Sequence, residues 1–415
     1  MQVSTREFLR SFARIGFLSF GGPAAQISLM HTELVERRGW LDERQFLGAL
    51  SFCMLLPGPE AMQLATYTGW KLRGTWGGLI AGLLFVLPGA TVILTLALAY
   101  AHWGDVGLVQ ALFSGIKAAV LVIVALALWR LARRALTGWA HWALAILAFV
   151  AIYAAALPFP AIIAAAALWG AWHSRAETRD RAPSPAPGQT ARTLRTVAIW
   201  GTLWAAPVLI AYAMGATFLT DIALLFSKLA VVTFGGAYAV LAYMTQTVTQ
   251  THGWLSTGQM IDALGLAETT PGPLILVTQF VAMLAGFAKG GTALALMAGA
   301  LTLWVTFVPC FLWIFTGAPY LDRLLAQPRL RGALAAISAA VVGVIANLSL
   351  WFALHVLFEQ IARGPLGPYP ILSTLDWQAA ALTALAALLM VGLRTPMLPA
   401  LAVMAAAGAL LQMAP

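Results

Sequence analysis

Long apolar stretches, each of helix length and separated by short polar breaks, run through nearly the whole chain of 415 residues. An apolar stretch of about 20 residues is long enough to cross the hydrocarbon core of a bilayer as an α-helix. The chain does not show the short alternating segments typical of a transmembrane barrel. The pattern therefore predicts an all-α polytopic membrane protein with roughly 10–12 membrane segments.

The breaks divide this pattern into whole helices and half-helices. Two of the stretches are interrupted at glycine pairs, and four short helices flank two Pro-Gly-Pro triplets. The expected helices cover residues 7–34, 44–56, 60–72, 76–101, 106–129, 139–156, 157–173, 196–214, 217–250, 257–270, 274–288, 291–316, 331–358, 375–393 and 396–413.

The second half of the chain repeats the first half at an offset of 214 positions. The matches are Phe20-Gly21-Gly22 with Phe234-Gly235-Gly236, Pro57-Gly58-Pro59 with Pro271-Gly272-Pro273, Gly39-Trp40-Leu41 with Gly253-Trp254-Leu255, Gln45 with Gln259, Met30 with Met244, and Arg14 with Lys228. Matches at one offset indicate a duplication, and internal repeats are common in secondary transporters. We expect a first repeat over residues 1–173, a polar linker over 174–195 and a second repeat over 196–415.

The positive charges indicate that the two repeats are inverted. The linker carries five Arg, which favour the cytoplasmic side of the membrane. The loop at 102–105 carries no Lys or Arg, whereas the equivalent loop of the second repeat holds Arg323, Arg329 and Arg331. Because positive loops stay in the cytoplasm, equivalent loops are predicted to face opposite sides.

Composition supports the membrane class and limits the partners. The chain is 61% apolar and 9% charged with a mean hydropathy of +0.85, which excludes an ordinary soluble domain and a disordered chain. The net charge of +9 follows from positive inter-helix loops, so we expect a lipid bilayer and no nucleic acid as partner. Cys53 and Cys310 lie in separate apolar stretches, and no metal or cofactor motif is present. Monomer and homodimer stay open.

Each Pro-Gly-Pro triplet is predicted to end one helix and begin another. Proline lacks the N–H donor and suits the first turn of a helix. The new N-terminus exposes backbone N–H groups with roughly half a positive charge, which suits an anion. The helix-break residues are Pro23, Pro57, Pro59, Pro271 and Pro273. A kink filled by neighbouring helices is the structural alternative.

Polar residues near the breaks are the candidate site. Arg14 and Lys228 lie about two turns before their glycine pairs, and Glu60, Gln63, Tyr67 and Lys71 form one polar stripe on an apolar helix. The candidate substrate-binding residues are Arg14, Ser19, Gly21, Gly22, Gln26, Gly58, Glu60, Gln63, Tyr67, Lys228, Thr233, Gly235, Gly236, Thr270 and Gly272.

Two acids beside the breaks are the candidates for proton coupling. Glu60 stands in the first turn of its half-helix, where the helix dipole favours the ionised carboxylate. Glu268 stands in the last turn before the second triplet, where the dipole and the apolar surroundings favour the protonated form. We therefore expect Glu268 to carry the proton, and Glu60 to order the helix end. Capping by Glu60 alone is the simpler alternative.

These motifs resemble the chromate ion transporter family. The shared stretches are SFGGP at positions 19–23, LLPGPEAMQLATYTGW at 55–70, TFGG at 233–236 and LAETTPGPL at 266–274. The second glycine pair is followed by Ala237, whereas Pro23 follows the first. The resemblance implies a carrier of the bacterial inner membrane that exports chromate by using the proton gradient. It also implies that the protein is not an enzyme.

The residues alone leave other functions open. A sulfate carrier, a carrier of another oxyanion and an anion channel all fit a duplicated helical protein with anion-suited helix ends. An intramembrane enzyme acting on lipid phosphate would need a nucleophile–base pair or a metal cluster, and the sequence carries neither a His-Glu-x-x-His motif nor a phosphate loop. Chromate is a tetrahedral dianion, so backbone N–H groups and a few cations are suitable ligands for it.

Overall fold

The computed structural model describes residues 3–104, 106–174, 189–234, 237–325, 327–364 and 367–413. This part of the chain is almost entirely helical, which confirms the predicted fold class. Its helices are α1 (Thr5–Leu18), α2 (Gly22–His31), η1 (Thr32–Glu36), α3 (Glu43–Leu55), α4 (Glu60–Trp103), α5 (Gly107–Ala135), α6 (Trp139–Tyr153), α7 (Phe159–His173), α8 (Gln189–Ala213), α9 (Thr217–Val232), α10 (Ala237–Gln246), η3 (Thr247–Thr251), α11 (Thr257–Thr269), η4 (Leu274–Leu276), α12 (Val277–Gly317), η5 (Ala318–Tyr320), α13 (Leu321–Leu325), α14 (Pro328–Leu357), η6 (Leu372–Thr374), α15 (Trp377–Ala387), η7 (Leu388–Gly392) and α16 (Met397–Met413).

The chain breaks at the predicted glycine pairs. Helix α1 ends at Leu18, and α2 begins at Gly22 after Gly21 has turned the chain in the left-handed conformation with φ +86°. Glycine adopts this conformation without steric cost. In the second half α9 ends at Val232 and α10 begins at Ala237. Gly235 and Gly236 lie outside the described residues.

Helices α4 and α12 each consist of two antiparallel helices. The backbone leaves helical geometry at Arg73 and Gly74 in α4, and at Gly290 and Gly291 in α12. A Cβ on Gly82 would lie 2.5 Å from the hydroxyl oxygen of Thr66, so the two arms of α4 pack tightly against each other. These turns confirm the predicted pairs 60–72 with 76–101 and 274–288 with 291–316.

Helices α3 and α11, which occupy equivalent positions in the two repeats, begin in the same way. Asp42 and Gln45 form a capping box at the start of α3, in which the Asp42 carboxylate accepts from the Gln45 amide at 2.7 Å. Ser256 and Gln259 repeat this exchange at the start of α11. Such caps satisfy N–H groups that have no partner inside the helix. The two repeats therefore share the capping interactions at the start of this helix as well as sequence matches.

Three elements differ from the sequence-based expectation. Helix α8 begins at Gln189 and not at 196, because Gln, Ala, Arg and Leu are good helix formers even where they are polar. The rest of the expected linker, 175–188, lies outside the described residues. The strands β1 (Ile361–Gly364) and β2 (Gly367–Pro370) form an antiparallel hairpin, with Ile361 opposite Pro370. The short helix α13 was also not predicted.

Five helices are long and apolar enough to cross a membrane within the described ranges. They cover residues Glu60–Trp103, Gly107–Ala135, Gln189–Ala213, Leu274–Leu325 and Pro328–Leu357. Four shorter apolar helices cover Trp139–Tyr153, Phe159–His173, Trp377–Gly392 and Met397–Gln412. The number of 10–12 membrane segments stays a prediction, since two of these long segments contain the turns described above.

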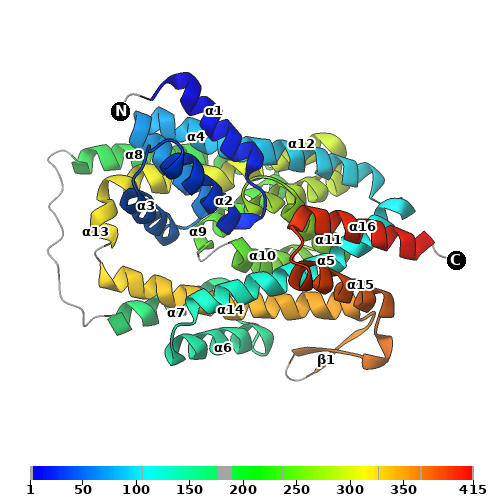
Figure 1. Ribbon diagram of the computed structural model, residues 1–415. Helices are drawn as coiled ribbons and strands as arrows, with labels where there is room; N and C mark the ends of the chain where they lie inside the picture. The colour runs from blue at the N-terminus through cyan, green and yellow to red at the C-terminus, as the bar shows by residue number, and fades with distance from the viewer. Residues whose placement is uncertain are drawn as a thin grey trace. The chain divides into compact units, whose positions relative to one another are not determined.

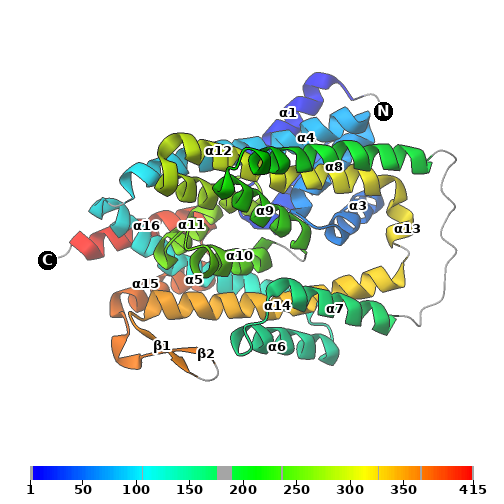
Figure 2. The same ribbon diagram turned by 180° about the vertical axis from the view of Figure 1, so that it is seen from behind.

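The first of two compact units comprises Met1–Leu98, Ala171–Val240 and Thr270–Leu334. Here α8, α9 and α12 lie side by side (Figure 2). Helix α1 packs closely on α4 (Figure 1), where a Cβ on Gly16 would lie 2.0 Å from the carbonyl oxygen of Leu84. That carbonyl receives no helical hydrogen bond, because Pro88 four residues later has no N–H. The close approach therefore requires glycine in α1.

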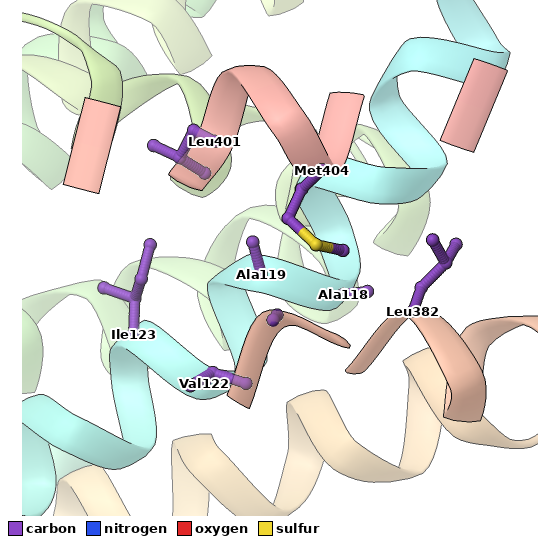
Figure 3. Packing of buried hydrophobic residues seen from close by; sticks show 8 residues of the cluster. Ala118, Ala119, Val122, Ile123, Leu382, Leu401 and Met404 are labelled. Carbon is purple, nitrogen blue, oxygen red and sulfur yellow. The ribbon is translucent and has the colours of Figure 1, made fainter. Parts of the chain in front are cut away.

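The second unit comprises Ala99–Gly170, Leu241–Thr269 and Ala335–Pro415. Its apolar core lies between α5, α15 and α16 (Figure 3) and consists of Ala118, Ala119, Val122, Ile123, Leu382, Ala386, Leu401 and Met404. A smaller core joins α6, α7 and α14 through Ala148, Ile162, Ala166 and Ala340. Alanine makes up most of the smaller core and part of the larger one, as is usual where helices associate without an aqueous driving force.

Candidate functional site

The two half-helices that follow the Pro-Gly-Pro triplets form the interior of the first unit. Every residue over 61–69 and over 271–286 is buried. An ordinary surface helix presents a polar face to solvent, and these two half-helices present none. The triplets in front of them therefore lie where a backbone N–H or C=O group must find a partner inside the protein.

Each triplet finds that partner in the glycine break of the other half. The Gly58 amide donates to the carbonyl oxygen of Thr233 at 2.8 Å, and the Gly272 amide donates to the carbonyl oxygen of Ser19 at 2.9 Å. Ser19 and Thr233 follow the last residues of α1 and α9, where the final carbonyls have no intrahelical donor. The two bonds are equivalent under the repeat, and they connect the two halves of the sequence reciprocally.

Buried glutamine side chains satisfy further carbonyls at the breaks. The side-chain amide of Gln26 donates to the carbonyl oxygen of Gly272 at 2.7 Å and to that of Ser19 at 3.3 Å. It therefore connects the end of α1 with the second Pro-Gly-Pro triplet. The Gln63 amide donates to Pro57 at 2.7 Å. The Gln63 Oε1 atom is buried and has no hydrogen-bond partner among the described residues. Gln26 and Gln63, which were both predicted as site residues, thus form hydrogen bonds with backbone carbonyls at the breaks.

The beginning of α2 is accessible, in contrast to the half-helices. Gly21 is exposed, and a Cβ on Gly22 would meet no atom within 4 Å. Pro23 occupies the first turn of the helix as predicted. The first N–H groups of a helix have no internal acceptor and carry partial positive charge. Open space beside them offers room for a small anion.

The other predicted stripe residues divide into two groups. Glu60 begins α4 and is partly buried, directly after Pro59. Tyr67 is buried between Phe52 and Trp70, with ring centroids 6.0 Å apart in both cases. Lys71 is exposed near the turn at the end of the half-helix. Of the stripe, Glu60 and Gln63 are the residues that lie at the helix break.

Arg14 takes part in an ion cluster that the sequence did not predict. Its Nε lies 3.3 Å from the carboxylate of Glu33, whose side chain is 1% exposed. Arg37 contacts the same carboxylate at 2.6 Å, and Arg38 is a third partner. Glu7 lies 3.9 Å from Arg38, so the cluster combines three cations with two acids and carries a net positive charge. The spacing of Glu33 and Arg37, four residues apart on a helix, was the available sequence signal.

The remaining candidates lie in the second half. Lys228 is exposed on α9, Thr233 is buried at the end of that helix, and Thr270 is buried directly before Pro271. Glu268 lies in the last turn of α11, and its side chain lies outside what the structure describes. Helix α11 ends at Thr269 and the next turn begins at Leu274, so Pro271 and Pro273 occupy the predicted break.

Gln279 is a further buried polar residue that sequence reasoning missed. Its amide donates to the carbonyl oxygen of Ala90 at 3.2 Å, and its Oε1 atom is buried without a hydrogen-bond partner among the described residues. It was missed because the motif match ends before it. The half-helix after the second triplet begins with an additional turn, η4. The equivalent glycines Gly74 and Gly291 are therefore 217 positions apart, and the offset of 214 no longer holds beyond the triplet.

Buried half-helices that start at paired breaks inside a multi-pass helical fold are characteristic of membrane transporters. Sequence comparison makes this class specific. The family model of the chromate transporter matches residues 6–171 and 220–411. The chain belongs to the chromate transporter family, which is a family of transporters and not of enzymes.

Curated relatives agree with this assignment. The chain is 30% identical over 348 residues to a protein of Synechococcus elongatus named "Probable chromate transport protein", covering 83% of each chain. It is 28% identical over 349 residues to the "Chromate transport protein" of Cupriavidus metallidurans, covering 82% of this chain and 80% of the relative. It is 30% identical over 352 residues to the "Chromate transport protein" of Pseudomonas aeruginosa, covering 83% and 80%. No solved structure shows significant similarity.

Proposed function

We propose that this protein is a secondary active carrier that exports chromate across the bacterial inner membrane by using the proton gradient. The observation that carries the proposal is the reciprocal pairing of Gly58 with Thr233 and of Gly272 with Ser19. Each pairing joins a helix beginning of one repeat to a helix end of the other. Because two breaks are tied together at each junction, a movement of one repeat must change both.

The substrate in this proposal is a tetrahedral dianion. Helix beginnings at the breaks offer N–H groups, and the accessible start of α2 at Gly21 and Gly22 has space for a small ligand. The three cations Arg14, Arg37 and Arg38 outnumber the two acids Glu33 and Glu7 that contact them, and this excess adds positive potential on the α1 and α2 side. Backbone donors with fixed direction suit an oxyanion because they lose little conformational freedom on binding.

The proposed substrate-binding residues include both break pairs. From the first half they are Arg14, Ser19, Gly21, Gly22, Gln26, Gly58, Glu60, Gln63 and Tyr67, and from the second half Lys228, Thr233, Gly235, Gly236, Thr270 and Gly272. We further propose that the two repeats have opposite orientation in the membrane. Sulfate is the competing substrate, since it has the same charge and shape.

The test is transport of labelled chromate into inverted membrane vesicles, with and without a proton gradient. We expect uptake that depends on the gradient and proceeds against the chromate concentration difference. Sulfate added in excess measures selectivity. Uptake that only dissipates a chromate gradient would make the protein a channel, and stronger transport of sulfate than of chromate would make it a sulfate carrier.

One charge variant tests the site directly. Lys228→Gln removes a cation of α9 two turns before the second break, and it is expected to raise the chromate concentration for half-maximal transport. Lys289→Gln is the matched control, because Lys289 lies over the ring of Phe218 at 5.0 Å in the same unit, away from the breaks. Equal kinetics of the two variants would remove Lys228 from the site.

A further inference from the structure

The second unit contains a buried acid that the proposed substrate site does not use. Asp262 lies in the middle of α11, and its side chain is 7% exposed. The Tyr100 hydroxyl donates to its Oδ2 at 2.7 Å, and the Lys117 Nζ lies 3.2 Å from its Oδ1. Its neighbours Ile261 and Ala263 are buried apolar residues. An ionisable residue in such surroundings is costly to keep, and in membrane proteins it commonly marks an ion or proton site.

The carboxylate retains room for a proton. Its Oδ1 is buried, and the Lys117 ammonium, at 3.2 Å, is its ion-pair partner. A carboxylate oxygen offers two lone pairs, so Oδ1 has acceptor capacity that the described residues leave unused. A pair that served stability alone would be expected to satisfy these positions, because incomplete hydrogen bonding makes a buried ion pair unfavourable.

A polar cavity reaches the partner of this acid. Lys117 is 31% exposed and lines a cavity of about 500 Å³ together with Ser114, Thr257, His355, Glu359 and Asp376. A second cavity of about 470 Å³ shares His355 and Ile361 as wall residues. Every residue that lines either cavity belongs to the second unit. Cavities of this size that have several polar groups in their walls have room for water, which can deliver protons.

The site belongs to one repeat only. Asp262 corresponds to Gly48 at the offset of 214, so the first half has no acid at this position. Helix α11 continues from Asp262 to Thr269 and then into the break at Pro271. A change in how α11 packs on α5 is therefore transmitted along a rigid helix to the second Pro-Gly-Pro triplet.

We infer that Asp262, held between Lys117 and Tyr100 beside the polar cavity, is a proton-binding site of the transport cycle. The inference rests on the proposed proton coupling, and it names Asp262 as the residue at which protons enter the protein. In the step, a proton from cavity water bonds to Oδ1 of the Asp262 carboxylate. The acid becomes neutral, the attraction to the Lys117 ammonium is lost, and the contact between α5 and α11 loosens. When the proton leaves Oδ1 again, the ion pair with Lys117 is restored, so that one proton passes through this site in each cycle.

The groups that face Asp262 come from several elements. Tyr100 is contributed by α4 and Lys117 by α5, and α16 packs on α11 without an ionisable side chain. His355, Glu359 and Asp376 share the cavity with Lys117. Asp376 caps α15 by accepting from the amide of Ala379 at 2.9 Å, so it is already engaged. Of these groups, Asp262 combines burial with an open acceptor position.

The experiment uses the full-length protein in liposomes, with chromate as substrate and a pH-sensitive dye inside. Wild type should show chromate flux with proton flux of opposite direction. Asp262→Asn should lose the proton flux and the pH dependence of transport, while exchange of chromate for chromate persists. Infrared difference spectra between high and low pH should show, among the bands of the other acids, one carbonyl band of a buried protonated carboxylic acid in wild type that is missing in the variant. Tyr100→Phe should move the pH midpoint of transport upward, since the hydroxyl stabilises the carboxylate.

Controls separate this inference from the proposed function and from misfolding. Asp221→Asn changes an exposed acid of α9 and should behave as wild type. If Asp262→Asn does not fold, Asp262→Asn combined with Lys117→Gln removes both charges together and should show the same loss of coupling. Wild type without any gradient-dependent chromate flux would refute the proposed function itself. Wild-type coupling that persists unchanged in Asp262→Asn, or in the double variant, would refute the role of Asp262 alone.

Discussion

The amide of Gly58 donates a hydrogen bond to the carbonyl oxygen of Thr233 at 2.8 Å, and the repeat duplicates this bond between Gly272 and Ser19 at 2.9 Å. Gly58 has φ +119°, and its amide points away from its own helix toward the end of α9. The bond thus depends on a backbone conformation that only glycine adopts readily.

Gly58→Ala should destabilise the protein and disturb the first break. A Cβ at this position would lie 2.9 Å from the Cys310 sulfur, and alanine at positive φ costs about 1–3 kcal/mol. Thermal unfolding in detergent measures the loss. Gly48→Ala is the matched control, because Gly48 lies inside α3 with nothing within 4 Å of a Cβ. An equal melting temperature of both variants would show that the Gly58 conformation is not required.

Glu33→Gln should lower the free energy of unfolding by about 3 kcal/mol, since it leaves Arg14, Arg37 and Arg38 without their buried partner. The loss of stability should lie near the lower end of the range for a broken buried ion pair, because water can solvate the half-exposed side chains of Arg14 and Arg37. Glu36→Gln, at an exposed acid in the same turn, should change stability little. Similar losses in the two variants would contradict a special role of Glu33.

Single-cysteine labelling tests the orientation of the repeats. Val106 follows α4, and Gln327 lies in the loop between α13 and α14. Cysteines introduced at these two exposed positions should react with a membrane-impermeant reagent from opposite sides. The native thiols Cys53 and Cys310 are buried and should not react. Reaction of both introduced cysteines from the same side would refute the inverted arrangement.

Glu268 and Glu60 should differ in function, because they lie at opposite kinds of helix end. Glu268→Gln is expected to abolish gradient-driven accumulation of chromate while binding remains measurable. Glu60→Gln, at the first residue of α4, should weaken binding or folding instead. Transport assays at several pH values, with binding measured separately, check both outcomes. Accumulation with a normal pH dependence in Glu268→Gln would remove Glu268 from the proton path.

His31 should make stability depend on pH at the end of α2. A hydrogen bond from its ring to Glu43, at 2.7 Å, raises the pKa of His31, and Glu36 adds to the effect. The protonated ring stabilises the folded state. This contribution is complete below about pH 6.5, the ordinary pKa of histidine, and disappears as the pH rises through the raised pKa. Melting temperatures of wild type and His31→Gln should therefore converge with rising pH, and a constant difference would contradict this.

The sequence by itself determined the helices and their breaks. Apolar length, glycine pairs and Pro-Gly-Pro triplets act locally, because they decide which backbone N–H groups exist and which φ values are accessible. The turns in α4 and α12 and the starts of α2 and α10 therefore fall where the pattern predicted them. The duplication was also readable, since it is a property of the order of residues.

Only the tertiary structure decided which groups meet. Nothing in the order of residues states that Gly58 pairs with Thr233 of the other repeat, because that bond joins two backbone groups without side-chain identity. The pairing of Asp262 with Lys117 and Tyr100 was hidden for a similar reason, as the three residues come from three helices. Arg14 was expected to lie on the same helix face as the first break, and in the structure its guanidinium forms an ion pair with Glu33. Local patterns determine where a helix begins and ends, and long-range packing determines which buried charges and carbonyls become neighbours.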